Sequence, residues 1–534
     1  MTTVHARVFR NSYRDSVELM QIAAELEAIA GVDRAGLVMA TPANLEVLAA
    51  AGLLSEAVAG AAPNDLVVAL SASDEDVVAQ ALDRAAMRLA GSGSEGPNGT
   101  AGTTVRTIAE ARVELGAANL ALISTPGTYA TAEALKALKR GLHVFLFSDN
   151  VPIEDEIELK ALARARGLLV MGPDCGTAIV DGVPLGFANA VRRGPIGLIG
   201  ASGTGLQQVS CLIDRFGAGV SQAIGVGGRD LDERVGGVMM LAALERLAAD
   251  SATDLIVLIS KPPAAAVAER VLAAAGTIAK PVIVNFLGGD PAVVTAAGSI
   301  PAATFEAAAA IASAMALGRP VPVVDGLGGD APDTPDDAAA DAAADAADAG
   351  QHGAGSFAVR EAKAALDPGQ WRIRGLYSGG SLAGEAKLVL LASMGADAAK
   401  RHEVIDLGDD EYTVGRPHPM IDPRLRNEHL AAAASDPSTA VILLDVVIGY
   451  GSNPDPAGAL ADAIDAARAE AARQGRRFAV VASVCGTSGD PQGLAAQEAR
   501  LAQAGVILAP SNARAARLAA RIVSPATVAA GVQR

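Results

Sequence analysis

Three segments of this chain pass from a run of β-forming residues through a loop of small residues into an amphipathic helix. The loops contain Ser202, Gly203, Thr204 and Gly205 in the first segment, Ser378, Gly379, Gly380 and Ser381 in the second, and Gly486, Thr487 and Ser488 in the third. Such a loop leaves backbone N–H groups free and directs the positive end of a helix dipole at one point, which favours an anion. Each loop alone also suits an ordinary capped helix in a flavodoxin-like unit. Together, the three predict an α/β chain that handles phosphate or a phosphate-bearing substrate.

Length, charge and cysteine content narrow the class of protein. At 534 residues the chain exceeds one hydrophobic core, so we expect about three or four domains. A net charge of −17 with a single Trp disfavours a nucleic-acid partner. No uncharged apolar run reaches the roughly 20 residues of a membrane span, and the start has no signal-peptide pattern. The scattered Cys175, Cys211 and Cys485 give no disulfide framework or metal spacing, so we expect a soluble, cytoplasmic, metal-free α/β protein without a membrane partner.

The order of apolar runs and polar loops predicts several doubly wound α/β units. The expected parts are an N-terminal α/β subdomain with a Gly/Ser-rich linker (1–103), a Rossmann-like domain (104–193), a flavodoxin-type domain (194–324), a disordered acidic linker (325–355) and a second flavodoxin-type domain (356–534). The strands expected in the two flavodoxin-type domains are Ile196–Ile199, Ala223–Val226, Leu255–Ile259, Pro281–Asn285, Arg372–Leu376, Ala440–Leu444, Phe478–Ala482 and Gly505–Ala509. Both domains share a strand, a Ser/Gly/Thr loop and a helix, so the pattern indicates a pseudo-duplication.

Two further loops carry residues suited to an anionic substrate. Arg229 and Asp230 follow a predicted strand, where α/β sheets bind ligands, and an Arg beside glycines suits capture of a carboxylate or phosphate. A solvated surface loop explains this pair equally well. The Pro-rich loop of residues 415–430 contains Arg416, His418, Asp422, Arg424 and Arg426.

In that Pro-rich loop we take His418, Asp422 and Arg424 as candidate catalytic residues. His418 is the general acid or base, and the arginines grip an anion. A structural role in a rigid loop is the alternative for His418. Asp445 ends another predicted strand at the ligand-binding edge. We interpret Cys485 as a small buried residue and not as a nucleophile, because no His lies near it in sequence.

Several motifs resemble succinyl-CoA synthetase. The run HVFLFSDNVPIEDEIELKALARARGLLVMGPDCGTAIV is similar to the second half of the CoA-binding domain in the α subunit, and GLIGASGTGLQQVS resembles the next motif, whose helix points at a phosphorylated histidine. GVILAPSNARAARLAA resembles the end of the β-subunit ligase domain. With GLYSGGSLAGEA and HPMIDPRLRNEHL added, nearly the whole chain is similar to the acyl-CoA synthetase-like FdrA family. The resemblance implies a CoA-binding-like domain over 104–193 and ligase-like domains over 194–324 and 356–534.

The chain departs from succinyl-CoA synthetase at the catalytic parts. Residues 285–310, which match the phosphohistidine loop, contain no His, and Pro262 and Pro263 stand where the resemblance places a supporting Glu. No ATP-grasp domain is recognisable. The start of a Rossmann fold, in which GxGxxG joins a strand to a helix, is missing before residue 104, so the CoA site is expected to be incomplete. We therefore expect no phosphohistidine ligase and no required cofactor.

The resemblance implies a different reaction, because some FdrA-type proteins are subunits of an oxamate carbamoyltransferase. The expected ligands are carbamoyl phosphate or phosphate and a small carboxylate or amide substrate, with partner subunits in a hetero-complex. We expect the turns at Ser202–Gly205 and Gly486–Ser488 to face each other and hold phosphate, with Arg229, Arg424 or Arg426 on the carboxylate. The turn of Ser378, Gly379 and Gly380 is also a candidate for binding phosphate or substrate, with shaping of the last domain as its alternative role. The alternatives are an acyl-CoA ligase subunit that relies on a partner for ATP binding, and a non-catalytic scaffold.

Overall fold

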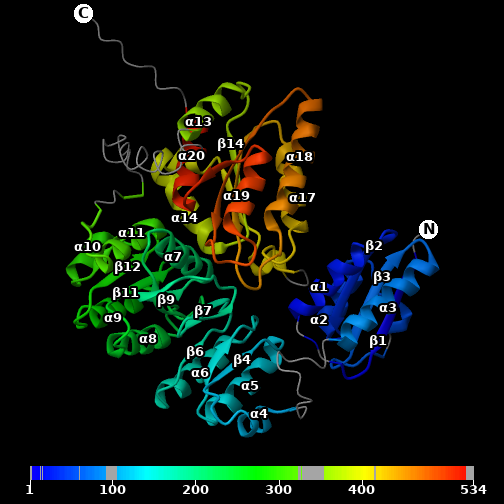
Figure 1. Ribbon diagram of the computed structural model, residues 1–534, viewed down its shortest axis with the longest axis horizontal. Coiled ribbons are helices and arrows are strands. Elements are labelled where there is room, and N and C mark those ends of the chain that lie inside the picture. The colour runs from blue at the N-terminus through cyan, green and yellow to red at the C-terminus, as the bar shows by residue number, and fades with distance from the viewer. Residues whose placement is uncertain are drawn as a thin grey trace, which may run out of the picture. The chain divides into compact units, whose positions relative to one another are not determined.

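The chain divides into two compact units in a computed structural model (Figure 1). One unit joins Met1–Ala118 to Asp409–Asp422, and the other joins Asn119–Gly408 to Pro423–Arg534. The residues that the structure describes are 3–12, 14, 16–58, 60–91, 105–322, 326–327, 354–413 and 417–524. The linkers expected at 91–103 and 325–355 lie outside the described residues, apart from residues 91, 326, 327, 354 and 355.

The first unit is built on a three-stranded antiparallel sheet. Its elements are β1 (Thr3–Phe9), α1 (Ser16–Glu27), β2 (Val32–Met39), α2 (Pro42–Ala50), η1 (Glu56–Val58), β3 (Leu66–Ala72), α3 (Glu75–Gly91), α4 (Ile108–Glu114) and α16 (Asp410–Thr413). The strand order is β1-β3-β2, and β3 is antiparallel to both neighbours. The antiparallel pairing sets this unit apart from the parallel sheets expected of doubly wound domains.

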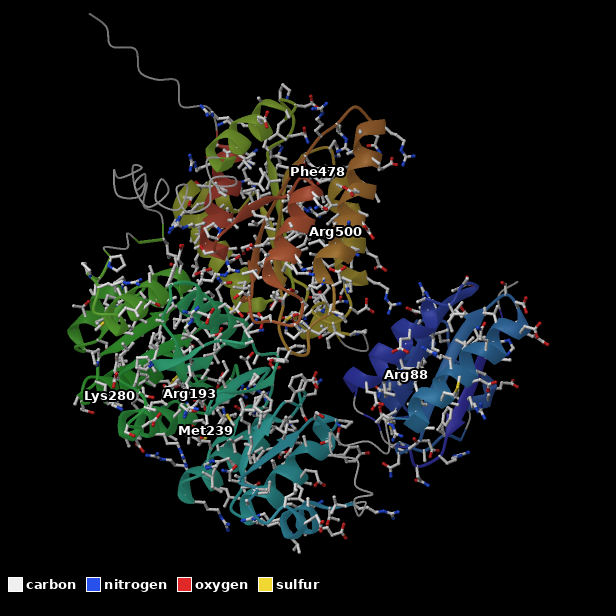
Figure 2. The ribbon with its side chains drawn as sticks, in the orientation of Figure 1. Arg88, Arg193, Met239, Lys280, Phe478 and Arg500 are labelled. Atoms are coloured by element: carbon white, nitrogen blue, oxygen red, sulfur yellow. The ribbon has the colours of Figure 1, made fainter. Side chains whose placement is uncertain are left out.

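Helices cover both faces of that antiparallel sheet. Helices α1 and α3 bury Leu26 and Ala81 against one face, while α2 and η1 bury Leu48 and Val58 against the other. Arg88, labelled in Figure 2, pairs with Glu25 at 2.8 Å and joins the exposed edges of α3 and α1. Burial of the central strand on both faces explains its continuous apolar run, LVVAL.

The second unit begins with a short parallel sheet of Rossmann type. Its elements are β4 (Leu120–Ile123), α5 (Gly127–Lys139), β5 (His143–Leu146), α6 (Ile153–Ala165) and β6 (Val170–Met171). The strand order is β4-β5-β6, and both pairings are parallel. The next two strands, β7 (Thr177–Val180) and β8 (Val183–Gly186), form a hairpin that joins the following sheet through β10.

A seven-stranded sheet, ordered β13-β12-β11-β9-β10-β7-β8, forms the centre of the second unit. Its further elements are β9 (Arg193–Ala201), α7 (Gly203–Arg215), β10 (Val220–Gly225), α8 (Val238–Ala249), β11 (Leu255–Ser260), α9 (Ala265–Ala275), β12 (Val282–Phe286), α10 (Pro291–Ala296), β13 (Ile300–Pro301) and α11 (Phe305–Ala316). Helices α7 and α11 lie on one face of the sheet, and α8 and α9 lie on the other (Figure 1). The strands expected in this region are confirmed.

A five-stranded parallel sheet, ordered β15-β14-β16-β17-β18, follows. Its elements are α13 (Ala354–Ala364), β14 (Arg372–Tyr377), α14 (Gly380–Met394), α15 (Ala396–Ala399), β15 (Glu403–Asp406), α17 (Arg424–Ser435), β16 (Thr439–Val447), α18 (Pro456–Arg473), β17 (Ala479–Cys485), α19 (Leu494–Gln503), β18 (Ile507–Ala509) and α20 (Asn512–Val523). Helices α14 and α20 pack together, as do α17 and α18.

The two large sheets share one strand order. Numbered by appearance, the five parallel strands β9–β13 and the five strands β14–β18 both run second, first, third, fourth, fifth across the sheet. This is the flavodoxin-like order, in which ligands bind where the first and third strands diverge. The expected α/β class and the pseudo-duplication are confirmed, and the helices after the two first strands, α7 and α14, mark the ligand-binding positions.

No helix within the described part of the chain is long and apolar enough to cross a membrane.

Candidate functional site

The first Gly-rich turn caps α7. Ser202 has an extended backbone, and its Oγ accepts a hydrogen bond from the amide of Gly205 at 3.1 Å. A side chain at Gly205 would collide with that hydroxyl, which explains the glycine. The expected N-cap is confirmed, and the buried Leu206 and Val209 form the apolar side of the helix.

The second turn, before α14, already binds an anion from within the chain. The carboxylate of Asp445, at the end of β16, accepts hydrogen bonds at 2.8 Å from the amides of Ser378 and Gly379, and the Ser378 hydroxyl lies 3.1 Å from both of its oxygens. Burial raises the pKa of Asp445, while Arg426 opposes that shift. The free amides that the sequence offers for phosphate at Ser378 and Gly379 therefore hold Asp445.

The first turns of α7 and α14 lie side by side. Ser202 donates from its Oγ to the Oγ of Ser381 at 2.6 Å, across 179 residues of sequence. The side chain of Thr204 packs so closely on Gly379 that a Cβ there would come 2.8 Å from Thr204 Cγ2. The Ser378 turn therefore does more than shape the last domain, because it places the start of α14 against the start of α7.

A cation and a carboxylate that the sequence analysis missed adjoin these helix ends. Lys261 follows β11, and its Nζ lies 3.5 Å from the point that a Cβ on Gly380 would occupy. Asp406, the last residue of β15, places Oδ2 against the same point. The signal for both residues is their position at the end of a strand, since Lys261 directly follows β11 and Asp406 is the last residue of β15, at the carboxyl edge of a parallel sheet.

The third turn does not open a helix. After β17 the chain turns through Gly486–Ser488, and α19 begins only at Leu494. Asp490 accepts a hydrogen bond from the amide of Thr487 at 2.7 Å, and Thr487 donates from its hydroxyl to the carbonyl of Ala190 at 2.6 Å. The expected facing of the Ser202 and Gly486 turns is wrong, since the carbonyl of Gly486 accepts a hydrogen bond from Arg215, the last residue of α7, whereas Ser202 caps the start of that helix.

Arg229 and Asp230 belong to an internal charge cluster with Glu156 and Lys160. Arg229 Nε pairs with Glu156 Oε2 at 2.9 Å, and its Nη2 donates to the carbonyl of Val151. Lys160 is fully buried and pairs with Glu156 at 2.7 Å and with Asp230 at 2.8 Å. The guanidinium expected to grip a substrate carboxylate thus holds Glu156.

Asp230 also caps α8. Its carboxylate accepts hydrogen bonds from the amides of Met239 (labelled in Figure 2) and Met240, at the start of that helix. The buried charge cluster therefore fixes the conformation of the loop between β10 and α8.

The Pro-rich loop is shared between the two compact units. His418 and Asp422 belong to the segment grouped with the first unit, where His418 Nδ1 accepts from the amide of Met420 at 3.2 Å. Arg424 opens α17 in the second unit. Arg426 is buried and donates to the carbonyl of Asp445 at 2.8 Å, and its pKa is lowered by burial. Arg426 thus contacts Asp445 inside the protein. The catalytic roles expected of His418, Asp422 and Arg424 stay predictions.

Arg416 lies outside the described residues. Cys485 is buried, as interpreted from the sequence.

Glu385 lies within α14 and ties it to two other helices. Its Oε1 accepts from the amide of Phe305 in α11 at 2.7 Å, and its Oε2 accepts from Asn512 Nδ2 in α20 at 2.9 Å. Burial raises the pKa of Glu385 to about 7. Tyr377 is buried beneath the same turn, and its pKa is raised by burial and by the nearby charges of Asp445 and Glu385.

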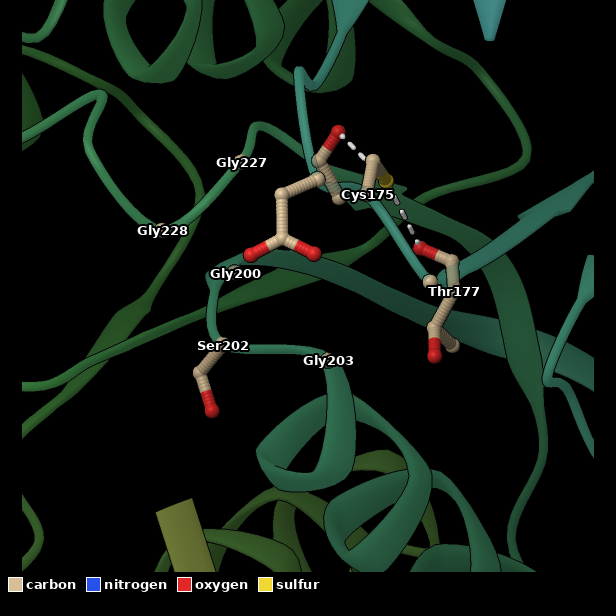
Figure 3. Close-up of a pocket in the computed structure, with 10 residues that line it drawn as sticks. Cys175, Thr177, Gly200, Ser202, Gly203, Gly227 and Gly228 are labelled. Carbon is tan, nitrogen blue, oxygen red and sulfur yellow. Dashed lines mark hydrogen bonds between the residues drawn. The ribbon is translucent and has the colours of Figure 1, made fainter. Parts of the chain in front are cut away.

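A narrow pocket opens next to the first turn of α7 (Figure 3). The residues that line it are Asp174, Cys175, Gly176, Thr177, Gly200, Ser202, Gly203, Gly225, Gly227 and Gly228. Figure 3 shows Ser202 and Gly203 on one side of it and Gly227 and Gly228 on the other. The pocket lies at the carboxyl ends of β9 and β10, the usual ligand-binding edge of a parallel sheet.

Comparison with known proteins assigns the chain to a family. The uncharacterized protein YahF of Escherichia coli strain K12 is 39% identical over 532 residues, covering 96% of this chain and 97% of YahF. The chain belongs to the FdrA family. Three family models match this FdrA-family chain: CoA-ligase over residues 376–522, CoA binding domain over 191–288, and AllF, heavy metal-associated domain, over 1–105.

Subunits of succinate–CoA ligase are among the other relatives of this FdrA-family chain. The alpha subunit of an ADP-forming succinate–CoA ligase from Methanothermobacter thermautotrophicus is 26% identical over 219 residues, covering 39% of this chain and 73% of that subunit. A solved dinucleotide-forming acetyl-coenzyme A synthetase 1 from Ca. Korarchaeum cryptofilum is 16% identical, with a TM-score of 0.32 over 76% of this chain and 82% of that one. The FdrA-family chain is thus acyl-CoA synthetase-like.

The CoA-binding match implies bound CoA and the heavy metal-associated match implies a bound metal ion, and the residues present fit neither group. The CoA-binding match overlaps the range expected to be CoA-binding-like, 104–193, only at residues 191–193. Of the residues that line the pocket in the described part of the matched region, none is Lys or Arg, so this pocket does not suit the phosphates of CoA. Residues 1–105 contain no cysteine, and no cluster of metal-ligating side chains occurs among the described residues. The expected domain boundaries stay predictions.

Proposed function

We propose that this chain is the carbamoyl-transferring subunit of an oxamate carbamoyltransferase-type enzyme. In this proposal it binds carbamoyl phosphate or phosphate where the first turns of α7 and α14 meet. The observation that carries the proposal is the 2.6 Å contact between Ser202 and Ser381, with Lys261 beside Gly380. Amides at a helix start point outward along the axis, so two adjacent starts and an ammonium group favour one shared anion.

The charges around this point favour a donor with both an anionic and an N–H group. Each helix start acts as roughly half a positive charge. With Lys261 and Arg426 added and Asp406 and Asp445 subtracted, the local charge is about +1. Carbamoyl phosphate offers a phosphate to the cationic side and an NH₂ group to a carboxylate such as Asp406, whereas a simple acyl phosphate offers no N–H donor.

The absence of a histidine in residues 285–310 supports a free phosphate-bearing donor over a phosphohistidine. In the proposed mechanism, Lys261 and the helix amides hold the phosphate, and they stabilise the charge that grows on it as the C–O bond breaks. The Ser202 and Ser381 hydroxyls orient the donor, and partner subunits complete the enzyme. No cofactor takes part.

A second candidate is an acyl-CoA-forming subunit, which the CoA-ligase and CoA-binding family matches favour. The two candidates differ in products. The full chain, purified with its partner subunits, is incubated with oxalurate and phosphate in one assay and with succinyl phosphate and CoA in the other. Carbamoyl phosphate and oxamate are expected from the first assay. Acyl-CoA from the second and nothing from the first would favour the ligase, and no product with no phosphate binding would favour a scaffold.

Lys261→Gln should weaken the binding of inorganic phosphate about tenfold, because it removes the cation beside α14 without removing side-chain length. Isothermal titration calorimetry with phosphate measures the affinity. Lys387→Gln is the matched control, since Lys387 is exposed and lies farther along α14. Equal phosphate affinity in the wild type and in Lys261→Gln would show that Lys261 does not bind the phosphate.

A further inference from the structure

The groups at the meeting point of α7 and α14 differ in their exposure to solvent. Ser202 and Ser381 are buried, at 6% and 4% exposure, and their hydroxyls bond to each other. Thr204, the second residue of α7, and Gly380 are half-buried, and Lys261 is exposed. A phosphate that arrives from solvent therefore meets Thr204, Gly380 and Lys261 first.

The first amides of both helices are free to bind an anion. In α7 the amides of Gly203 and Thr204 donate to no acceptor in the described part of the chain, because the hydroxyl of the capping serine bonds to the amide after them. In α14 the amides of Gly380 and Ser381 are likewise without an acceptor among the residues that the structure describes. The half-buried side chain of Thr204 thus lies among four free amides.

The side chain of Thr204 faces the start of α14. A Cβ on Gly379 would lie 2.8 Å from Thr204 Cγ2 and 3.0 Å from Thr204 Oγ1, so both branches of the threonine adjoin this glycine. Within the described residues the Thr204 hydroxyl makes no hydrogen bond. A hydroxyl that can donate one hydrogen bond is therefore available between the two helix starts.

The contact with Thr204 explains why residue 379 is a glycine. The backbone of Gly379 is extended, with φ −112° and ψ 111°, a conformation that any residue adopts. A side chain is excluded there only by the atoms of Thr204. A methyl group would have to move them from 2.8 Å to the 3.4 Å at which ordinary contact begins, a shift of 0.6 Å between the two helix starts.

We propose that Thr204 is a further binding residue for the phosphate group of the substrate, and that its contact with Gly379 sets the spacing of the two helix starts. This inference rests on the proposed function and deepens it. The Thr204 hydroxyl donates to a phosphate oxygen beside the free amides and Lys261. Its methyl group, against Gly379, keeps α7 and α14 close enough for both to reach the same phosphate.

Thr204→Val and Thr204→Ser separate the two branches of this side chain. Valine keeps the shape and removes the hydroxyl, so the affinity of the full chain for inorganic phosphate should fall about tenfold, the usual effect of losing one hydrogen bond to a charged group. Serine keeps the hydroxyl, so Thr204→Ser should bind phosphate within about threefold of the wild type. Isothermal titration calorimetry measures both affinities.

Gly379→Ala tests the spacing. The added methyl group should separate the helix starts and lower the phosphate affinity about tenfold, since a small misplacement of binding groups is costly. In a Thr204→Gly background the same alanine should cost nothing further, because the atoms that it meets are gone. Gly384→Ala is the matched control in the same helix, because a Cβ there would meet only Leu287 Cδ1, at an ordinary 3.9 Å.

Thermal unfolding shows which of these variants are folded, and the two Thr204 variants decide the role of the hydroxyl even where Gly379→Ala does not fold. A Thr204→Val protein or a folded Gly379→Ala protein that binds phosphate as tightly as the wild type overturns this inference. Phosphate binding and carbamoyl transfer by the wild type would then still support the proposed function. A wild type that neither binds phosphate nor transfers a carbamoyl group overturns both.

Discussion

Lys160→Met is expected to lower the free energy of unfolding by about 3–5 kcal/mol, the usual loss when one partner of a buried ion pair is removed. Lys160 is fully buried, and its Nζ lies 2.7 Å from Glu156, 2.8 Å from Asp230 and 2.9 Å from the carbonyl of Val226. Methionine fills the volume but removes the cation that the two buried carboxylates share, so Glu156 keeps Arg229 while Asp230 keeps the amides of Met239 and Met240. Urea denaturation of the full chain measures the loss.

The same helix offers a matched control for that prediction. Arg164 lies one turn after Lys160 in α6 and pairs with Glu245 at 2.6 Å, but both side chains are largely exposed. Arg164→Met should cost less than about 1 kcal/mol, because solvent screens such a pair. Equal losses in the two variants would show that the buried cluster contributes no more than a surface pair.

Glu385→Gln is expected to remove a pH dependence of stability worth about 3 kcal/mol. Burial, helped by the charge of Glu306, raises the pKa of Glu385 from its ordinary 4.5 to about 7. The bonds from Asn512 and from the Phe305 amide, with the charge of Arg517, oppose the shift.

Between these two pKa values the folded protein binds a proton that the unfolded chain releases. The contribution of Glu385 to the free energy of unfolding therefore falls as the pH rises from 4.5 to 7, and this contribution is constant outside that window. Other carboxylates titrate in the same range, so the measured quantity is the difference in unfolding free energy between wild type and Glu385→Gln at each pH.

That difference should change by about 3 kcal/mol across the window and stay constant above pH 8. Glu269→Gln changes an exposed glutamate on α9 and serves as the control, which should track the wild type. A Glu385→Gln curve parallel to that of the wild type would contradict a buried carboxyl that is protonated at neutral pH.

Local features of the fold could be predicted from the sequence. The run GLIGASGTG predicts a buried strand, a capping serine and a helix, and all three occur, because each depends on residues within a few positions of Ser202. The parallel α/β class and the pseudo-duplication also follow from repeated strand–loop–helix units. The antiparallel sheet of the first unit was not foreseen, since strand direction depends on pairings such as Thr3 with Ala72.

The candidate site was predicted only in part. Ser202 lies at its centre, but the turn that meets it contains Ser381 and not Gly486. Three similar turns cannot be ranked by local pattern, because each offers the same amides and small side chains. What separates them is a distant carboxylate, since Asp445 and Asp490 hold the second and third turns in different ways.

Residues with ordinary sequence surroundings were missed for the same reason. Lys261 lies before two prolines that the sequence marks only as a missing glutamate, and Asp406 ends β15, a strand that is not among the expected ones. These side chains meet at the site only when folding brings the carboxyl ends of several strands to one edge of the sheets.

The sequence by itself determined that three strand–loop–helix turns would form and that Ser202 would cap a helix, because short-range hydrogen bonding and burial decide such features. Only the tertiary structure decided which turns keep their amides free and which bind carboxylates of the same chain. That outcome depends on contacts between residues far apart in sequence, such as the Ser202–Ser381 bond across 179 residues and the Thr487–Ala190 bond across 297 residues. The first of these bonds arises only when two sheets of equal strand order pack with their first helices together.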